Sequence, residues 1–188
     1  DEVSYDLDTS IIFHEQNSTF FNQVDNPLSK NNLKTVKQFI EKNFGELTIA
    51  ALTCGAASEY PQAFLNIDRI KEKQRTIDDS IRSLESKLEA LSPTNFFLAG
   101  GTYFIPGKLF PLNQYVALPG HEKVTQLLSE NVLQPLNLEG GKTVSLTGSI
   151  DSLPIEIIEM IKPCTNSMEE SIEAHSRDKF LYEDGNFI

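Results

Sequence analysis

The stretch SIIFHEQNSTFFNQVDNPLSKNNLKTVKQFIEKNFGELTIAAL, residues 10–52, decides the fold class of this chain. Two short apolar runs, 11–13 and 20–21, flank the turn residues Glu-Gln-Asn-Ser, and this pattern predicts a β-hairpin. Apolar residues at helical spacing follow and predict a helix that ends at Gly45. The apolar run from Leu47 to Thr53 then predicts a buried strand. The order strand, helix, strand predicts an α/β architecture in which helices cover a sheet.

The segments after residue 60 extend this pattern. Residues 66–91 predict the longest helix, because apolar residues recur at spacings of 4, 3, 4 and 3: Ile77, Ile81, Leu84, Leu88 and Leu91. This seam covers only about two to three heptads, which favours packing on its own domain over a dimeric coiled coil.

The remaining segments are predicted with less detail. Residues 95–105 predict a buried strand with a bend at the paired glycines, and residues 120–132 predict a helix. A short strand pair is expected in residues 138–148, and a helical turn or two in residues 152–161. We assign residues 1–162 to one domain and the polar, acidic residues 163–188 to a peripheral tail.

The composition limits the possible partners. The chain has 188 residues, of which 39% are apolar and 23% charged, and its net charge is −11. An acidic surface repels phosphate backbones and anionic lipid. We therefore expect neither nucleic acid nor a membrane surface as a partner. No apolar run reaches the roughly 18 residues of a membrane span. We expect a cytoplasmic protein in which the two cysteines, Cys54 and Cys164, are reduced thiols.

Taken by themselves, the residues form no catalytic constellation. The histidines lie far apart and show no zinc-binding spacing: His14, His121 and His175. Cys54 follows a predicted strand, but no His is near it in sequence, so a buried structural thiol is the better interpretation. The glycines at 100–101 lack the frame of a phosphate-binding loop. Asp25 stays open between a turn acid that caps the next helix and a metal ligand at the edge of a sheet.

Three stretches carry a resemblance to a known family. They are DTSIIFHEQNSTFFNQVDNPL (8–28), GELTIAALTCGAASEYPQAF (45–64) and NFFLAGGTYFIPGKLFPLNQY (95–115). Their order and spacing resemble the C-terminal half of the metallo-β-lactamase-fold hydrolases, in the branch with UlaG-like hydrolases and proteins of CMP-N-acetylneuraminate monooxygenase type. The resemblance spans about residues 6 to 120 and implies half of an αββα sandwich.

The resemblance also implies a chemistry. In that family, the Asp at the corresponding strand end ligates a metal pair, which nominates Asp25 as a metal ligand. Asn22, which can shape the turn, Tyr60 and Tyr103 become candidates for the substrate pocket. The implied cofactor is a divalent metal, zinc first, with manganese or iron as alternatives. The implied reaction is attack of metal-bound hydroxide on an ester, phosphoester or amide-type bond of a small-molecule substrate.

The chain departs from the family pattern at two points. The HxHxDH motif is absent, and residues 99–101 stand where the last His of the family is expected. The main ligands are therefore expected on a missing N-terminal segment, and a first residue of Asp1 instead of Met favours a fragment. We expect the N-terminal half of the same protein as the partner, and a homo-oligomer stays possible. The alternative is a degenerate, non-catalytic member that acts as a scaffold or regulatory domain through the helix at 66–91.

Overall fold

The computed structural model describes residues 9–24, 26–55, 57–100, 103–129, 132–136, 142–144 and 150–152. The elements are β1 (Ile11–Glu15), β2 (Ser18–Asn22), α1 (Lys30–Asn43), β3 (Ile49–Leu52), α2 (Arg69–Leu91), β4 (Asn95–Leu98), the 3-10 helix η1 (Gly107–Tyr115), α3 (His121–Leu127), β5 (Lys142–Val144) and β6 (Ile150–Ser152). The predicted α/β class is confirmed. The proposed tail at 163–188 lies outside the described residues.

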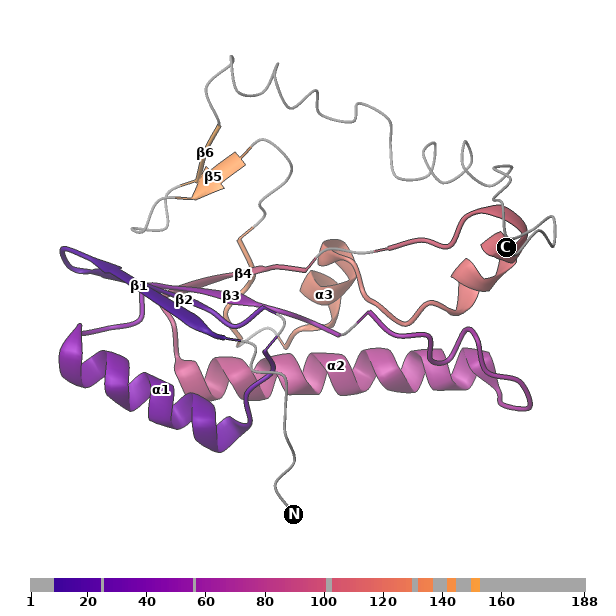
Figure 1. Cartoon of the computed structure of the whole chain (residues 1–188), viewed down its shortest axis with the longest axis horizontal. Helices are drawn as coiled ribbons and strands as arrows, with labels where there is room; N and C mark the ends of the chain where they lie inside the picture. Colours follow the sequence, from indigo (N-terminus) through magenta and orange to yellow (C-terminus); the bar gives the residue numbers. More distant parts are fainter. Residues whose placement is uncertain are drawn as a thin grey trace, which may run out of the picture.

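One mixed sheet with the order β1-β2-β3-β4 organises the molecule. β1 and β2 pair antiparallel, whereas β2, β3 and β4 run parallel. The connections between the parallel strands contain α1 and α2, and both helices lie on the same face of the sheet (Figure 1). Because parallel strands point the same way, β2, β3 and β4 end at one edge of the sheet, at Asn22, Leu52 and Leu98.

The face of the sheet that meets α1 and α2 holds the main core. Successive strand residues point to opposite faces, and Phe21, Ala50 and Phe96 point toward the helices. Ala90 of α2 is buried, and so are all five residues of the predicted seam: Ile77, Ile81, Leu84, Leu88 and Leu91. The expectation that this helix packs on its own domain is therefore confirmed.

The opposite face of the sheet, here called the open face, consists of Phe13, Phe20, Ile49, Ala51 and Phe97. The ring centroids of Phe13 and Phe20 are 6.0 Å apart, and those of Phe20 and Phe97 are 6.2 Å apart, both pairs stacked. Phe13 is 56% exposed, while Ile49, which pairs with Phe20 in the neighbouring strand, is 1% exposed. Neither α1 nor α2 contributes to this face (Figure 1).

The limits of α1 follow from capping chemistry. Ser29 is the N-cap residue, and its hydroxyl oxygen accepts a hydrogen bond from the backbone N–H of Asn32 at 3.2 Å. After the C-cap Phe44, Gly45 has a φ of 93°, so the predicted glycine stop is confirmed. The capping role that one interpretation gave to Asp25 is filled by Ser29, while Asp25 itself lies outside the described residues.

The predicted strand at 95–105 is too long. β4 stops at Leu98, and Gly100 has a φ of 100°, a left-handed conformation that turns the chain out of the sheet. The chain then forms η1, which was not predicted. The side chain of Asn113 holds the start of this segment, because its Oδ1 accepts from the N–H of Ile105 and its Nδ2 donates to the Ile105 carbonyl, each at 2.7 Å.

The C-terminal predictions have mixed outcomes. α3 ends at Leu127, several residues before the predicted helix end. In place of a strand pair within 138–148, β5 pairs antiparallel with β6 at 150–152. The helical turns predicted in 152–161 fall almost wholly outside the described residues.

Candidate functional site

A cleft of about 870 Å³ opens at the edge of the sheet where the parallel strands end. One wall is formed by residues that follow β3, among them Thr53 and Cys54, and by Ala99 and Gly100, which follow β4. α2 forms the opposite wall. Ligands of open α/β sheets bind at the carboxyl ends of the strands, so this position makes the cleft the first candidate for a binding site.

The wall contributed by α2 is polar. Its residues recur on one side of the helix: Arg75, Thr76, Asp79, Ser80, Ser83 and Lys87. This polar side adjoins the buried apolar seam, and residues three and four apart on a helix are neighbours. The sequence prediction identified the seam but missed this site, since a polar helix side ordinarily faces solvent.

Lys87 is a partly buried cation in the α2 wall of the cleft. Its Nζ donates to the backbone carbonyl of Thr53 at 3.2 Å, and the side chain is half-buried. Within the described ranges it makes no ion pair with a carboxylate. Burial lowers the pKa of Lys87, as expected for an ammonium group that is partly removed from water.

Cys54 lies in the same wall and is 7% exposed. Burial raises the pKa of its thiol to about 11, although the nearby charge of Lys87 acts in the opposite direction. The thiol is therefore neutral near pH 7. This agrees with the prediction of a buried, unreactive thiol, since the thiolate is the nucleophilic form.

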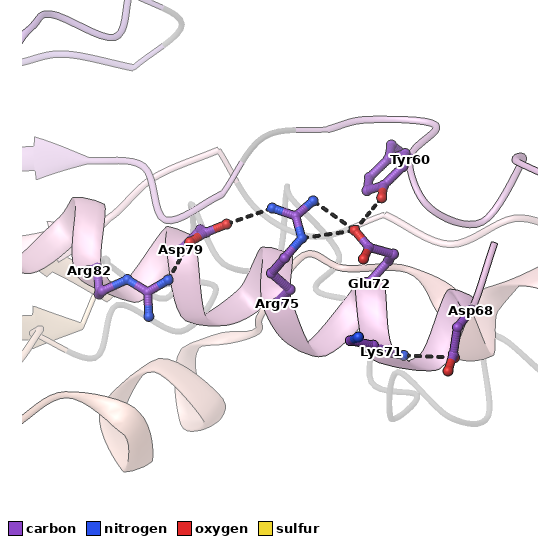
Figure 2. A network of polar contacts seen from close by, with 7 residues as sticks. All are labelled: Tyr60, Asp68, Lys71, Glu72, Arg75, Asp79 and Arg82. Carbon is purple, nitrogen blue, oxygen red and sulfur yellow. Dashed lines mark hydrogen bonds and ion pairs between the residues drawn. The ribbon is translucent and has the colours of Figure 1, made fainter.

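A network of polar contacts runs along α2 at one end of the cleft (Figure 2). The guanidinium of Arg75 contacts Glu72 Oε2 at 2.8 Å and Asp79 Oδ2 at 3.0 Å. Asp79 also pairs with Arg82, and the Tyr60 hydroxyl donates to Glu72. The hydrogen bonds from Tyr60 and then Arg75 lower the pKa of Glu72. The charge of Arg75 is thus balanced by two carboxylates.

Tyr103 forms part of the cleft wall. Its hydroxyl donates to the carbonyl of Ser58 at 2.6 Å and accepts from Nε2 of Gln62 at 2.7 Å. These bonds fix the phenol against the loop that follows β3. Gln62 itself is 3% exposed, and its Oε1 has no hydrogen-bond partner within the described structure.

The predicted pocket residues have different places. Tyr103 lines the cleft, and Tyr60 reaches it only indirectly, through Glu72 and Arg75. Asn22 is not among the lining residues; its Oδ1 accepts from the N–H of Val24 at 2.9 Å and so closes the turn after β2. A role in substrate binding stays a prediction for all three.

The residues that the structure describes do not form a metal site. No group of three or more His, Cys, Asp or Glu side chains among them is arranged to hold a metal ion. Asp25 lies outside the described residues, so its predicted role as a ligand stays a prediction. The described donor set alone does not fit zinc, manganese or iron.

Buried polar atoms without partners occur beside the same sheet edge. Gln23 follows β2 and is 1% exposed, and neither Nε2 nor Oε1 of its side chain has a hydrogen-bond partner in the described structure. The buried Oγ of Ser10, just before β1, also has no hydrogen-bond partner in the described structure. Unpaired buried polar groups are rare in folded proteins, which sets this edge apart from the helix-covered core.

Comparisons with known proteins add no relative. No family model matches the chain, and neither a curated protein nor a solved structure matches it. The resemblance drawn from the sequence therefore stays a prediction. Among the described residues, no helix is both long and apolar enough to cross a membrane.

Proposed function

We propose that this chain is the C-terminal half of a metal-dependent hydrolase of metallo-β-lactamase fold. The observation that supports the proposal is the one-sided sheet, which has α1 and α2 on one face and an aromatic open face on the other (Figure 1). In an αββα sandwich, two sheets pack through the faces that carry no helices. The exposed ring of Phe13 and the stacked rings of Phe20 and Phe97 suit such a contact.

The placement of the strand ends fits the same proposal. Asp25 follows β2 in sequence, and β2 ends at the sheet edge that β3 and β4 share. The remaining ligands would come from an N-terminal half of the same protein, because the HxHxDH motif of that family is absent from this sequence. The proposed cofactor is zinc, with manganese or iron as alternatives. The proposed substrate is a small molecule with an ester, phosphoester or amide-type bond, and we propose a cytoplasmic location.

A second candidate is a non-catalytic scaffold or regulatory domain. The apolar seam of α2 is buried within this chain, so it offers no partner surface. The observation that favours an interaction lies at the start of α2, where Leu65 is 75% and Ile70 is 61% exposed. A scaffold would therefore use this end of the helix instead of its seam.

The test compares metal content and hydrolase turnover in the full-length protein with and without Asp25→Asn. We expect the variant to lose bound metal and turnover while circular dichroism shows an unchanged fold, because Asn removes the charge that offsets the metal. Asp78→Asn serves as the matched control, since Asp78 lies on α2 and its carboxylate accepts one hydrogen bond from the residues that the structure describes, from Gln74 Nε2 at 2.7 Å. Equal metal content in wild type and Asp25→Asn would remove Asp25 from the site.

A further inference from the structure

We propose that the cleft between the strand ends and α2 binds an oxyanion group, a phosphate or a carboxylate, with Lys87 as its charged contact. The cleft is built from residues of this chain alone. The inference therefore does not rest on the proposed hydrolase function, and it holds or fails separately from it.

The charges around the cleft leave Lys87 without a counter-ion among the described residues. Glu72 and Asp79 oppose Arg75 and Arg82, so the network in Figure 2 carries as many negative as positive charges. Lys87 stands apart from this network, and in the described part of the chain its one hydrogen-bond partner is the carbonyl of Thr53. A partly buried cation without a counter-ion is costly, and an anion in the cleft would offset that cost.

The residues beside Lys87 also suit an anion. Ser83 lies one helical turn before Lys87 on the same side of α2, and both residues line the cleft. The Ser83 hydroxyl makes no hydrogen bond to any residue that the structure describes, so it is free to donate to a ligand oxygen. Cys54, also near Lys87, is a neutral thiol and does not compete with an anion. An ammonium and a hydroxyl at this spacing suit the oxygens of one phosphate or carboxylate group.

The acidity of the whole chain opposes non-specific binding of anions. Its net charge is −11, which repels anions from the general surface. Saturable binding of a small anion therefore requires a local positive site, and weak non-specific association does not imitate it.

The experiment titrates the chain with inorganic phosphate and, separately, with acetate, at pH 7 and constant ionic strength, by NMR chemical shifts. We expect saturable binding of at least one anion, with shifts at residues of the cleft, and the anion that binds identifies the group. Lys87→Met should weaken binding at least tenfold, Lys87→Arg should retain most of it, and Ser83→Ala should weaken it several-fold.

Lys73→Met is the matched control. Lys73 also lies on α2, and its Nζ also donates to a backbone carbonyl, that of Gln114 at 2.8 Å, but it does not line the cleft. Phosphate or acetate binding should be unchanged in this variant. Urea unfolding separates binding from folding, because Lys87→Met removes an unbalanced charge and should not lower stability. The proposal is overturned if neither anion shows saturable binding, or if Lys87→Met binds the anion as tightly as wild type and Lys73→Met do.

Discussion

At the scale of single residues, Cys54 and Lys87 show how the cleft changes ordinary acid–base behaviour. Burial raises the pKa of the Cys54 thiol and lowers that of the Lys87 ammonium, and the charge of each group acts against the shift of the other. Both shifts favour the neutral form, as expected where water is partly excluded. An incoming anion therefore meets a protonated thiol and one ammonium, not a thiolate.

This environment predicts an unusual pH profile for alkylation of Cys54 by iodoacetamide. In a Cys164→Ser variant, which leaves Cys54 as the one thiol, the rate should keep rising to about pH 11 instead of levelling near 9.0. The sign follows from the thiolate, which is the reactive form and at pH 9 amounts to only about 1% when the pKa is about 11. Mass spectrometry of samples quenched at timed intervals measures the rate of alkylation.

The control is the same variant unfolded in urea, whose profile should level at the ordinary thiol value. A folded profile that levels near pH 9 would mean that the thiol is open to water.

At the scale of elements, the C-terminal end of α2 has a residue in a strained backbone conformation. Its C-cap residue, Ser92, adopts φ 45° and ψ 55°, a left-handed conformation that glycine tolerates better than serine. Ser92→Gly should therefore raise the free energy of unfolding by about 0.5–1 kcal/mol. The same change at Ser86, inside the helix, should lower it by about 0.5–1 kcal/mol. Urea denaturation of both variants checks the opposite signs, and a loss of stability in both would contradict the capping argument.

The elements also show what sequence can predict. The seam of α2, the glycine stop after α1 and the apolar run of β3 depend on neighbours a few residues away, and each was predicted correctly. The bend at the paired glycines was also predicted, and Gly100 has the left-handed φ of 100° that such a bend uses. The continuation of the strand to residue 105 was wrong, because the chain leaves the sheet at this turn and Asn113 then bonds to Ile105. The apolar character of residues 103–105 does not distinguish a strand from this loop.

The cleft was missed for a related reason. Ser83 and Lys87 read as an ordinary polar helix side, and they face a cavity only because β3 and β4 end opposite them. Tyr103 was nominated through a family resemblance, and it does line the cleft. The pairing of Tyr60 with Glu72 depends on a loop path that periodicity does not encode.

At the scale of the whole molecule, the two faces of the sheet predict different costs for two adjacent residues of β4. Phe96 is 0% exposed in the core beneath α1 and α2, whereas Phe97 lies on the open face and stacks on Phe20. Phe96→Ala should cost about 3–5 kcal/mol of unfolding free energy, the usual range for a buried aromatic side chain. Phe97→Ala should cost less in this chain, because the Phe97 ring is only partly buried, whereas Phe96 is fully buried.

The measurement is urea unfolding of the chain carrying each variant, with Phe39→Ala as a control for loss of an exposed aromatic ring, since Phe39 is 51% exposed. The expected order of costs is Phe96 above Phe97 and Phe97 above Phe39, because Phe97 is partly buried and Phe39 is mostly exposed. Equal, large costs at Phe96 and Phe97 would mean that this chain already covers both faces of its sheet. The half-sandwich would then lose its structural support, while the oxyanion site in the cleft, which lies on the α2 side, would be unaffected.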